Sequence, residues 1–189
     1  MSTKMQLFHT GFVRIPSPDL KYGRKNADFG QGFYLSDDEE FSKRWARERK
    51  DAESIINRYE LDLEGLEVKT FSRGDEWFGY IFDNRALRED KLCEYDVIIG
   101  PIANDTLYDT LGIITSGLLE REQALKLLML GREYLQIVIK SEKAKRQLRF
   151  ISAEVLESSE IERYKAALAL EEKEYQELFA VTLDKLIDG

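Results

Sequence analysis

Short apolar segments alternate with polar and glycine-containing stretches along the chain, and most of these apolar segments are too short to form helices. Segments of this kind, rich in β-branched and aromatic residues and bounded by turn residues, are typical of buried strands. The pattern predicts seven strands, at residues 5–9, 33–35, 58–63, 68–71, 95–99, 134–139 and 148–155. Gly100 and Pro101 are expected to end the fifth of these strands.

Helices are predicted where apolar residues recur every three or four positions, or where a capping residue precedes a charged run. Ser36, followed three residues later by Glu39, predicts the start of a charged helix that runs to about Ser54. Further helices are expected at residues 75–87, from a cap at Ser116 to Gly131, at 141–147, and from 161 to the end. Because strands and helices mix without strict β-α-β alternation, we predict an α+β fold.

Length and charge indicate one domain with an acidic end. The 189 residues include 28 Lys and Arg against 36 Asp and Glu, which gives a net charge of −8. Residues 158–189 hold eight acidic and four basic residues, so this segment contributes −4. We predict a domain over residues 1–157 and an acidic C-terminal helix over 158–189, which packs on the domain or extends it.

Composition excludes several functional classes. General DNA binding requires a basic surface, which a net negative charge disfavours. No run approaches the roughly 18 apolar residues of a membrane span. The first four residues lack the apolar core of an export signal, and the single cysteine, Cys93, cannot form an internal disulfide, so we expect a cytoplasmic protein. No cluster of His, Cys and carboxylate residues has the spacing of a metal site, and none is expected.

Two segments near the N-terminus carry the candidate chemistry. His9, the only histidine, ends the first predicted strand. Between Asp28 and Ser36, two glycines lie beside an aromatic strand, where the backbone can approach a flat ligand and an aromatic ring can stack on it. The same segment could instead be a tight turn that enters a core strand. The loop before it holds four basic residues that could bind a small anion or be solvated: Arg14, Lys21, Arg24 and Lys25.

Residues 29–36, Phe-Gly-Gln-Gly-Phe-Tyr-Leu-Ser, resemble a motif of the ADP-ribosyltransferase superfamily, Phe-Gly-Lys-Gly-Ile-Tyr-Phe-Ala, in the His-Tyr-Glu branch that includes the poly-ADP-ribose polymerases. Residues 11–18 are similar to the donor-loop entrance of that branch. The family places a serine eight residues after the motif tyrosine and a second tyrosine eleven residues after it, and here these positions are Ser42 and Trp45. Residues 133–139 resemble the third family motif, with Gln136 at the position of its glutamate.

The chain is further identified as a member of an uncharacterised bacterial family, domain of unknown function 3990. Residues 28–35 carry the family's Asp-Phe-Gly-x-Gly-Phe-Tyr-Leu string. Residues 95–105 match its Tyr-Asp-Val-x-x-Gly-x-x-Ala-Asn-Asp string. The resemblance to the superfamily spans about residues 7–155.

The resemblance implies an ADP-ribosyltransferase-like split β-sheet core with flanking helices, and NAD as the substrate. His9 would hydrogen-bond the adenosine-side ribose, while Tyr34 and Trp45 would enclose the nicotinamide ring. Ser42 would hold the nicotinamide carboxamide together with backbone groups near the end of the first strand. The remaining residues of the implied NAD site are Thr10, Gly11, Arg14 and Gly32.

The implied activity is transfer of a single ADP-ribose from NAD to an unknown protein or nucleic acid, with His9, Tyr34 and Gln136 as the catalytic positions. An amide at 136 can accept a ribose hydrogen bond but brings no charge to a cationic transition state. Polymer extension is therefore not expected, and Q136E is expected to raise NAD hydrolysis. Asp96 and Asp105 could receive the acceptor substrate, replace the missing carboxylate, or serve only in caps and turns. The alternative function is a catalytically inactive module that binds NAD, ADP-ribose or a protein partner.

Overall fold

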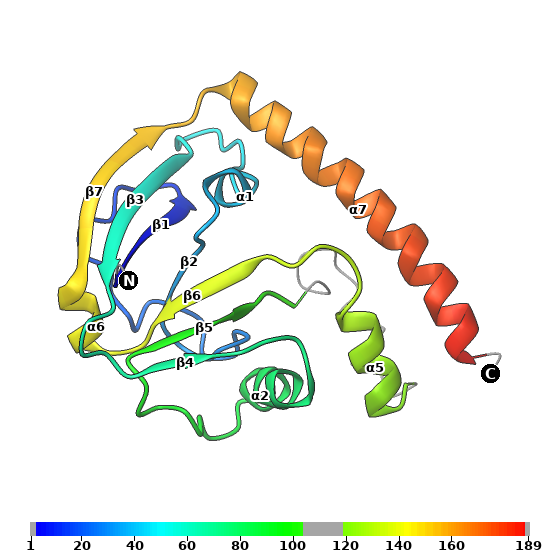
Figure 1. The fold of residues 1–189 in the computed structure, drawn as a ribbon. Helices are drawn as coiled ribbons and strands as arrows, with labels where there is room; N and C mark the ends of the chain where they lie inside the picture. Colours follow the sequence, from blue (N-terminus) through cyan, green and yellow to red (C-terminus); the bar gives the residue numbers. More distant parts are fainter. Residues whose placement is uncertain (1–2, 104–118, 188–189) are drawn as a thin grey trace.

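Two β-sheets form the centre of the fold in a computed structural model that describes residues 3–103 and 119–187 (Figure 1). Sheet A has the strand order β1-β3-β7 and is antiparallel. Sheet B has the order β2-β6-β5-β4, in which β4 and β5 are parallel and the other two pairs antiparallel. The strands are β1 (Lys4–Gly11), β2 (Phe33–Leu35), β3 (Ile55–Asp62), β4 (Val68–Thr70), β5 (Val97–Pro101), β6 (Leu135–Ile139) and β7 (Leu148–Val155).

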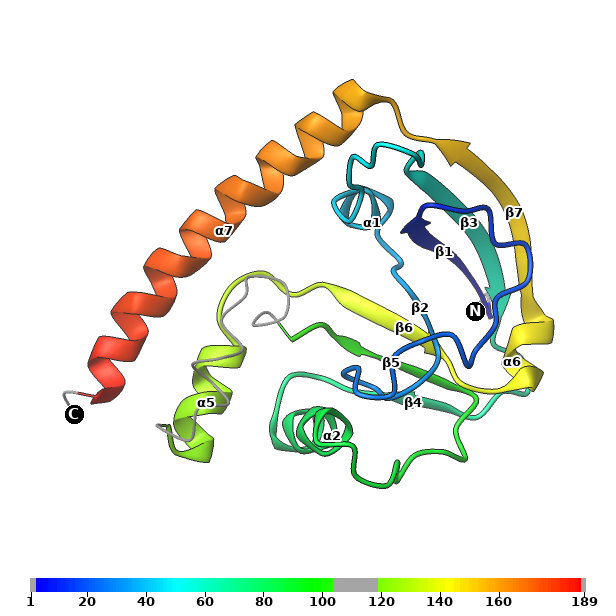
Figure 2. The same cartoon turned by 180° about the vertical axis from the view of Figure 1, so that it is seen from behind.

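The two sheets meet where β1 touches the end of β2. The Phe8 amide donates to the Ser36 carbonyl at 2.8 Å, and the Ser36 amide donates to the Phe8 carbonyl at 2.9 Å. From this bridge the sheets diverge, with β3 and β7 on one side and β6, β5 and β4 on the other (Figures 1 and 2). The predicted residue His9 directly follows the bridge on β1.

Five helices are described, and they complete a mixed α+β fold, which confirms the predicted class. One long helix, α7, leads from the end of β7 past α1 to α5 (Figure 2). On it, Ile161, Tyr164, Tyr175 and Phe179 are buried, whereas Leu178 is exposed. The bounds are α1 (Glu39–Lys43), α2 (Asp75–Arg85), α5 (Arg121–Leu128), α6 (Glu142–Gln147) and α7 (Ser158–Ile187).

Sheet B has a buried apolar cluster on each face. Its alternate residues Phe33 and Ile137 pack between the sheets with Leu7 and Tyr59 of sheet A. The opposite face carries Val138, which packs with residues of α2, α5 and α7 and with the loop residue Phe29. Because side chains alternate along a strand, this pattern decides which face of sheet B each predicted site residue occupies.

The helix predicted from Ser36 to Ser54 is wrong in its start and its length. Asp38 caps α1, since its carboxylate accepts from the Phe41 amide at 2.9 Å. Ser36 is bonded into the bridge with β1 and cannot act as that cap. After α1 the chain is held in a loop by Ser54, whose hydroxyl donates to the Arg47 carbonyl at 2.8 Å and accepts from the Arg47 amide at 3.1 Å.

The strand at 95–99 was expected to stop before Gly100, but β5 continues through Gly100 and Pro101. A Cβ at Gly100 would lie 2.9 Å from the Phe29 ring, so glycine lets this ring pack directly on the strand. Pro101 occupies the last position, where proline is tolerated in a strand. Helix α5 begins at Arg121, after Glu120, and the predicted cap Ser116 lies outside the described residues.

Candidate functional site

His9 lies at the junction of the two sheets. Its Nδ1 is 2.9 Å from the Tyr34 carbonyl oxygen, and its ring packs on Phe33 with 4.8 Å between ring centroids. Burial lowers the pKa of the imidazole, and the carbonyl bond only partly opposes this shift. His9 is therefore held neutral, with Nδ1–H donating to the carbonyl and Nε2 left as an acceptor. A Cβ at Gly11 would lie 3.4 Å from that Nε2, so any side chain larger than glycine's would contact this nitrogen.

Thr10 and Ser42 bring β1 and α1 together. Their hydroxyl oxygens lie 3.3 Å apart, and Ser42 is only 3% exposed. Ser42 occupies this place because Asp38 starts a short helix whose second turn faces the end of β1. The structure thus brings two hydroxyls together at the end of β1, one of them from a segment more than thirty residues away in sequence. Because side chains alternate along a strand, the Thr10 hydroxyl and the His9 imidazole point to opposite faces of β1.

Trp45 lies just beyond the end of α1 and is 41% exposed. Its ring meets Phe41 edge to face at 6.1 Å, and Phe41 in turn stacks on Tyr134 at 4.0 Å. The Trp45 indole therefore packs against Phe41 on one side and is accessible to solvent elsewhere. Among the described residues it makes no ring contact with Tyr34, and a flat ligand between the two rings would need them roughly 7 Å apart.

Tyr34 is part of a buried network on the outer face of sheet B. Its hydroxyl donates to the Gly30 carbonyl at 2.7 Å and accepts from the Phe29 amide at 3.0 Å. Burial raises the pKa of this phenol far above its ordinary value. The side chain thus stays neutral and ties the strand to the preceding turn, which is the tight-turn role weighed for residues 28–36 from the sequence.

Gln136 is on the same face of sheet B as Tyr34. Tyr34 is paired with Val138, and side chains two residues apart on a strand share a face. The amide nitrogen of Gln136 lies 3.4 Å from Oδ2 of Asp28 and 3.3 Å from the Pro101 carbonyl. His9 packs on Phe33 instead, so its imidazole and the Gln136 amide lie toward opposite faces of sheet B.

The other implied NAD residues lie at the edges of this arrangement. Arg14 is exposed, with its guanidinium 5.0 Å from the Phe150 ring centroid. The three basic residues of the following loop, Lys21, Arg24 and Lys25, are exposed as well. At Gly32 a Cβ would lie 2.7 Å from the Ile139 carbonyl oxygen, so this glycine is required by the close approach of the loop to β6.

Sequence reasoning missed the charged residues that hold the 28–34 turn. Oδ1 of Asp28 accepts from Nε and Nη2 of Arg85 at 2.9 and 2.8 Å. Nζ of Lys140 lies 2.6 Å from the Phe29 carbonyl and 2.8 Å from Oδ2 of Asp90. Asp28 adjoins the glycine motif and could have been singled out, whereas nothing in the sequence links Arg85 or Lys140 to it.

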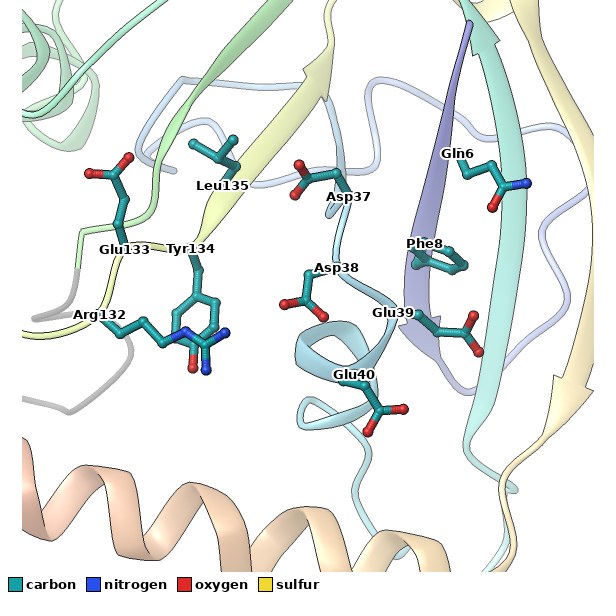
Figure 3. Close-up of a pocket in the computed structure, with 10 residues that line it drawn as sticks. All are labelled: Gln6, Phe8, Asp37, Asp38, Glu39, Glu40, Arg132, Glu133, Tyr134 and Leu135. Carbon is teal, nitrogen blue, oxygen red and sulfur yellow. The ribbon is translucent and has the colours of Figure 1, made fainter.

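A separate cavity of about 600 Å³ opens between the start of β6, the α1 segment and the edge of β1 (Figure 3). Burial, together with neighbouring Asp38, raises the pKa of Asp37 there. Glu39 is paired with Arg58 at 2.7 Å. None of the predicted NAD residues lines this cavity, whose lining is Gln6, Phe8, Asp37, Asp38, Glu39, Glu40, Arg132, Glu133, Tyr134 and Leu135.

Asp96 and Asp105, the two acidic residues considered as replacements for the missing carboxylate, differ in whether the structure describes them. Asp96 accepts from the Glu67 amide at 2.9 Å and binds Ser141 at 2.5 Å, and its Oδ2 lies 3.1 Å from Lys143. All three partners are distant in sequence, so Asp96 links the start of α6 to the segment before β4, and these bonds form neither a local cap nor a turn. Asp105 lies outside the described residues.

Metal and membrane features are absent from the part of the chain that the structure describes. Within residues 3–103 and 119–187, no three His, Cys, Asp or Glu side chains gather closely enough to bind a metal ion. Over the same ranges, no helix combines the length and apolar character needed to cross a bilayer.

Comparison with known proteins identifies one family. No curated protein and no solved structure matches the chain. The family model described as "Protein of unknown function (DUF3990)" matches residues 5–150, which is most of the chain and includes both sheets up to the middle of β7. The predicted family is confirmed, and the chain belongs to the DUF3990 family.

Proposed function

We propose that this protein binds NAD at the junction of β1, β2 and α1, and transfers its ADP-ribose to a protein or nucleic-acid acceptor. The observation that carries the proposal is the approach of the Thr10 and Ser42 hydroxyls at the end of β1, the strand that also carries His9. It supports the sequence resemblance because residues from two motifs, distant along the chain, meet at one place.

The hydroxyl pair suits a carboxamide. Each hydroxyl both donates and accepts hydrogen bonds, and a carboxamide offers one carbonyl acceptor and two N–H donors. The hydrogen bond between Thr10 and Ser42 is long at 3.3 Å, and therefore weak. A ligand amide that bonds to both hydroxyls can replace it at little cost in free energy. The half-exposed Trp45 ring, one helical turn from Ser42, adds a surface on which a nicotinamide ring can stack.

His9 suits a ribose. Its imidazole is neutral because burial lowers its pKa, so Nε2 can accept a hydrogen bond from a ribose hydroxyl without introducing a charge. The Gly11 backbone next to it leaves room for a sugar to approach.

In the proposed reaction the bond between the nicotinamide nitrogen and C1′ of the ribose breaks, and nicotinamide leaves with the bonding electron pair. A nucleophile of the acceptor forms the new bond to C1′ and loses its proton. The contribution of the protein is to orient the donor and hold the leaving group. The Gln136 amide brings no charge and faces the other side of sheet B from His9, so position 136 supplies no carboxylate to the cationic ribose. We therefore expect slow transfer and no polymer.

A second candidate is binding of NAD or ADP-ribose without transfer. The observation in its favour is that the Gln136 amide nitrogen is bonded within the protein, to Asp28 and Pro101. A residue held in this way can complete a pocket without taking part in bond cleavage.

Calorimetric titration with NAD, followed by assay of nicotinamide release from labelled NAD in a cell extract, tests both candidates. Binding together with release and a labelled macromolecule supports transfer. Binding without release, even after long incubation, supports the second candidate. Absence of binding by the intact protein at millimolar NAD rules out both.

A further inference from the structure

The orientation of the Gln136 amide is fixed by its neighbours. Its nitrogen faces Oδ2 of Asp28 and the carbonyl oxygen of Pro101, at 3.4 and 3.3 Å. A carboxylate and a carbonyl only accept hydrogen bonds, so the amide oxygen would be repelled from both. Oε1 of Gln136 must therefore point away from them, and no described residue donates a hydrogen bond to it.

Asp28 is itself held firmly. Its Oδ1 accepts from two nitrogens of Arg85, which leaves Oδ2 for Gln136 and for the Ala103 amide at 3.4 Å. The Asp28 carbonyl also accepts from Nδ2 of Asn84 at 3.3 Å. Pro101 is fixed by the fully buried Trp77, whose indole N–H donates to its carbonyl at 2.9 Å. Both acceptors are thus anchored to α2 before they contact Gln136.

We infer that Asp28 is a positioning residue that holds the Gln136 amide with its oxygen outward, so that position 136 needs an amide and not a carboxylate. For NAD, the inference rests on the proposed function: Gln136 faces away from His9, so its orientation acts on the donor site through β6, which pairs with β2. The pairing itself concerns only this chain and stands independently of the ligand.

A carboxylate at position 136 would meet a second carboxylate at the distance of a hydrogen bond. Two carboxyl groups sharing one site cannot both ionise freely, and the pKa of one of them rises. The titratable and charged groups around this corner are Asp28 from the loop, Arg85 from α2 and Tyr34 from β2, with Lys140 and Asp90 beside the Gly30 turn. Arg85 is bonded to the oxygen of Asp28 that faces away from Gln136, so it cannot separate the two carboxyls.

The test is Q136E, with NAD affinity and the midpoint of thermal unfolding measured between pH 5 and pH 8. At pH 8 we expect NAD binding roughly tenfold weaker than in the unmodified protein, which corresponds to the cost of a typical unfavourable buried contact. At pH 5 the protonated carboxyl can donate to Asp28, and the difference should shrink to about twofold. In the double variant D28N/Q136E, the amide at position 28 can donate to the carboxylate at position 136. We expect this variant to bind NAD more tightly than Q136E does at pH 8.

The matched control is Q176E on α7. Nε2 of Gln176 donates to Glu172 at 3.2 Å, so the same substitution places a carboxylate beside another one, but on an exposed surface. There, water screens the repulsion, and neither affinity nor its pH profile should change. A purely structural role for Gln136 would lower the unfolding midpoint without giving NAD affinity this pH profile.

Three outcomes overturn the inference: NAD binding or hydrolysis by Q136E at pH 8 that equals or exceeds that of the unmodified protein, a defect of equal size at both pH values, or no recovery in the double variant. If the unmodified protein binds no NAD, the proposed function fails. The pairing is then decided by unfolding alone, where the midpoint of Q136E should fall relative to the unmodified protein as pH rises.

Discussion

The turn from Asp28 to Tyr34 and the junction of β1 with α1 both carry predicted site residues, but their polar groups are used differently. In the turn, the Tyr34 hydroxyl, the Asp28 carboxylate and the Phe29 carbonyl are bonded to main chain or to charged side chains at 2.6–3.0 Å. At the junction, Thr10 and Ser42 share one long contact, and Trp45 keeps an exposed ring. The comparison separates a tightly bonded scaffold from a junction whose two hydroxyls share only a long contact.

The largest expected effect comes from G30A in the scaffold. Gly30 has φ of +72°, and its Cβ would lie 2.8 Å from Oδ1 of Asn84 and 3.1 Å from Nζ of Lys140. Left-handed backbone and overpacking together should reduce the free energy of unfolding by about 3 kcal/mol in urea titration. The control is G65A, where φ is +70° but the space is open, and there about 1 kcal/mol is expected. Equal losses at both glycines would contradict the packing argument.

The second largest effect is expected from K140M, which should reduce the free energy of unfolding by about 2 kcal/mol. This is somewhat less than for a fully buried ion pair, because the Asp90 side chain keeps some exposure. Burial alone would raise the pKa of Asp90, but Lys140 and hydrogen bonds to the carboxylate lower it overall. The native bonds thus stabilise the protein above pH about 4, and this contribution is lost as pH falls through the lowered pKa.

K91M is the exposed counterpart of K140M. Nζ of Lys91 pairs with Oδ2 of Asp83 at 2.7 Å, but the Lys91 side chain is 73% exposed. Its removal should change the free energy of unfolding by less than about 0.5 kcal/mol. If K140M, followed by urea titration between pH 3 and pH 7, behaved like K91M, the turn would not be the scaffold described above.

S42A tests the junction of β1 with α1. Loss of one hydroxyl from the carboxamide pair should weaken NAD binding by roughly two- to tenfold in calorimetric titration. Stability should change little, because the long contact with Thr10 is the one hydrogen bond that this hydroxyl makes to the described residues. The control is S36A, whose buried hydroxyl accepts from the Asp38 amide at 3.1 Å and should affect stability rather than affinity. The reverse assignment of the two effects would remove Ser42 from the ligand surface.

The smallest expected effect is the titration of His9. Because burial lowers its pKa, the folded protein binds the proton less well than the unfolded chain. Stability is therefore unaffected well above pH about 6.5, and falls as pH drops below that value. His9 is the only histidine, so the slope of the unfolding free energy between pH 7.5 and pH 5.5 should be reduced in H9N. An unchanged slope would show that His9 does not titrate differently in the folded state.

Sequence patterns predicted the elements well where local chemistry decides them. The bounds of β2 and β7 agree with the predicted runs at 33–35 and 148–155, and Ser141 caps α6 through the Ala144 amide. Prediction failed where contacts distant in sequence decide the structure. Ser36 has the pattern of a helix cap, but pairing with Phe8 holds it in an extended segment.

The candidate site shows the same division. The offsets that selected Ser42 bring it to Thr10, since a short helix and a strand end suffice to place them. The surroundings of Gln136 could not be foreseen, because its partner Asp28 is 108 residues away along the chain. Which face of a sheet a residue occupies, and which charge lies opposite it, follows only from the strand register.

Helix α7 has a consequence for the kinetics of folding. It joins Glu171 to Arg44 across 127 positions and Tyr164 to Glu40 across 124, and its Tyr175 completes the apolar cluster outside sheet B. Contacts between residues so far apart in sequence require very long loops to close, so we expect them to form late in folding. Wherever the helix is not docked, the apolar residues that it covers are open to water and to other chains, so loss of α7 contacts favours association.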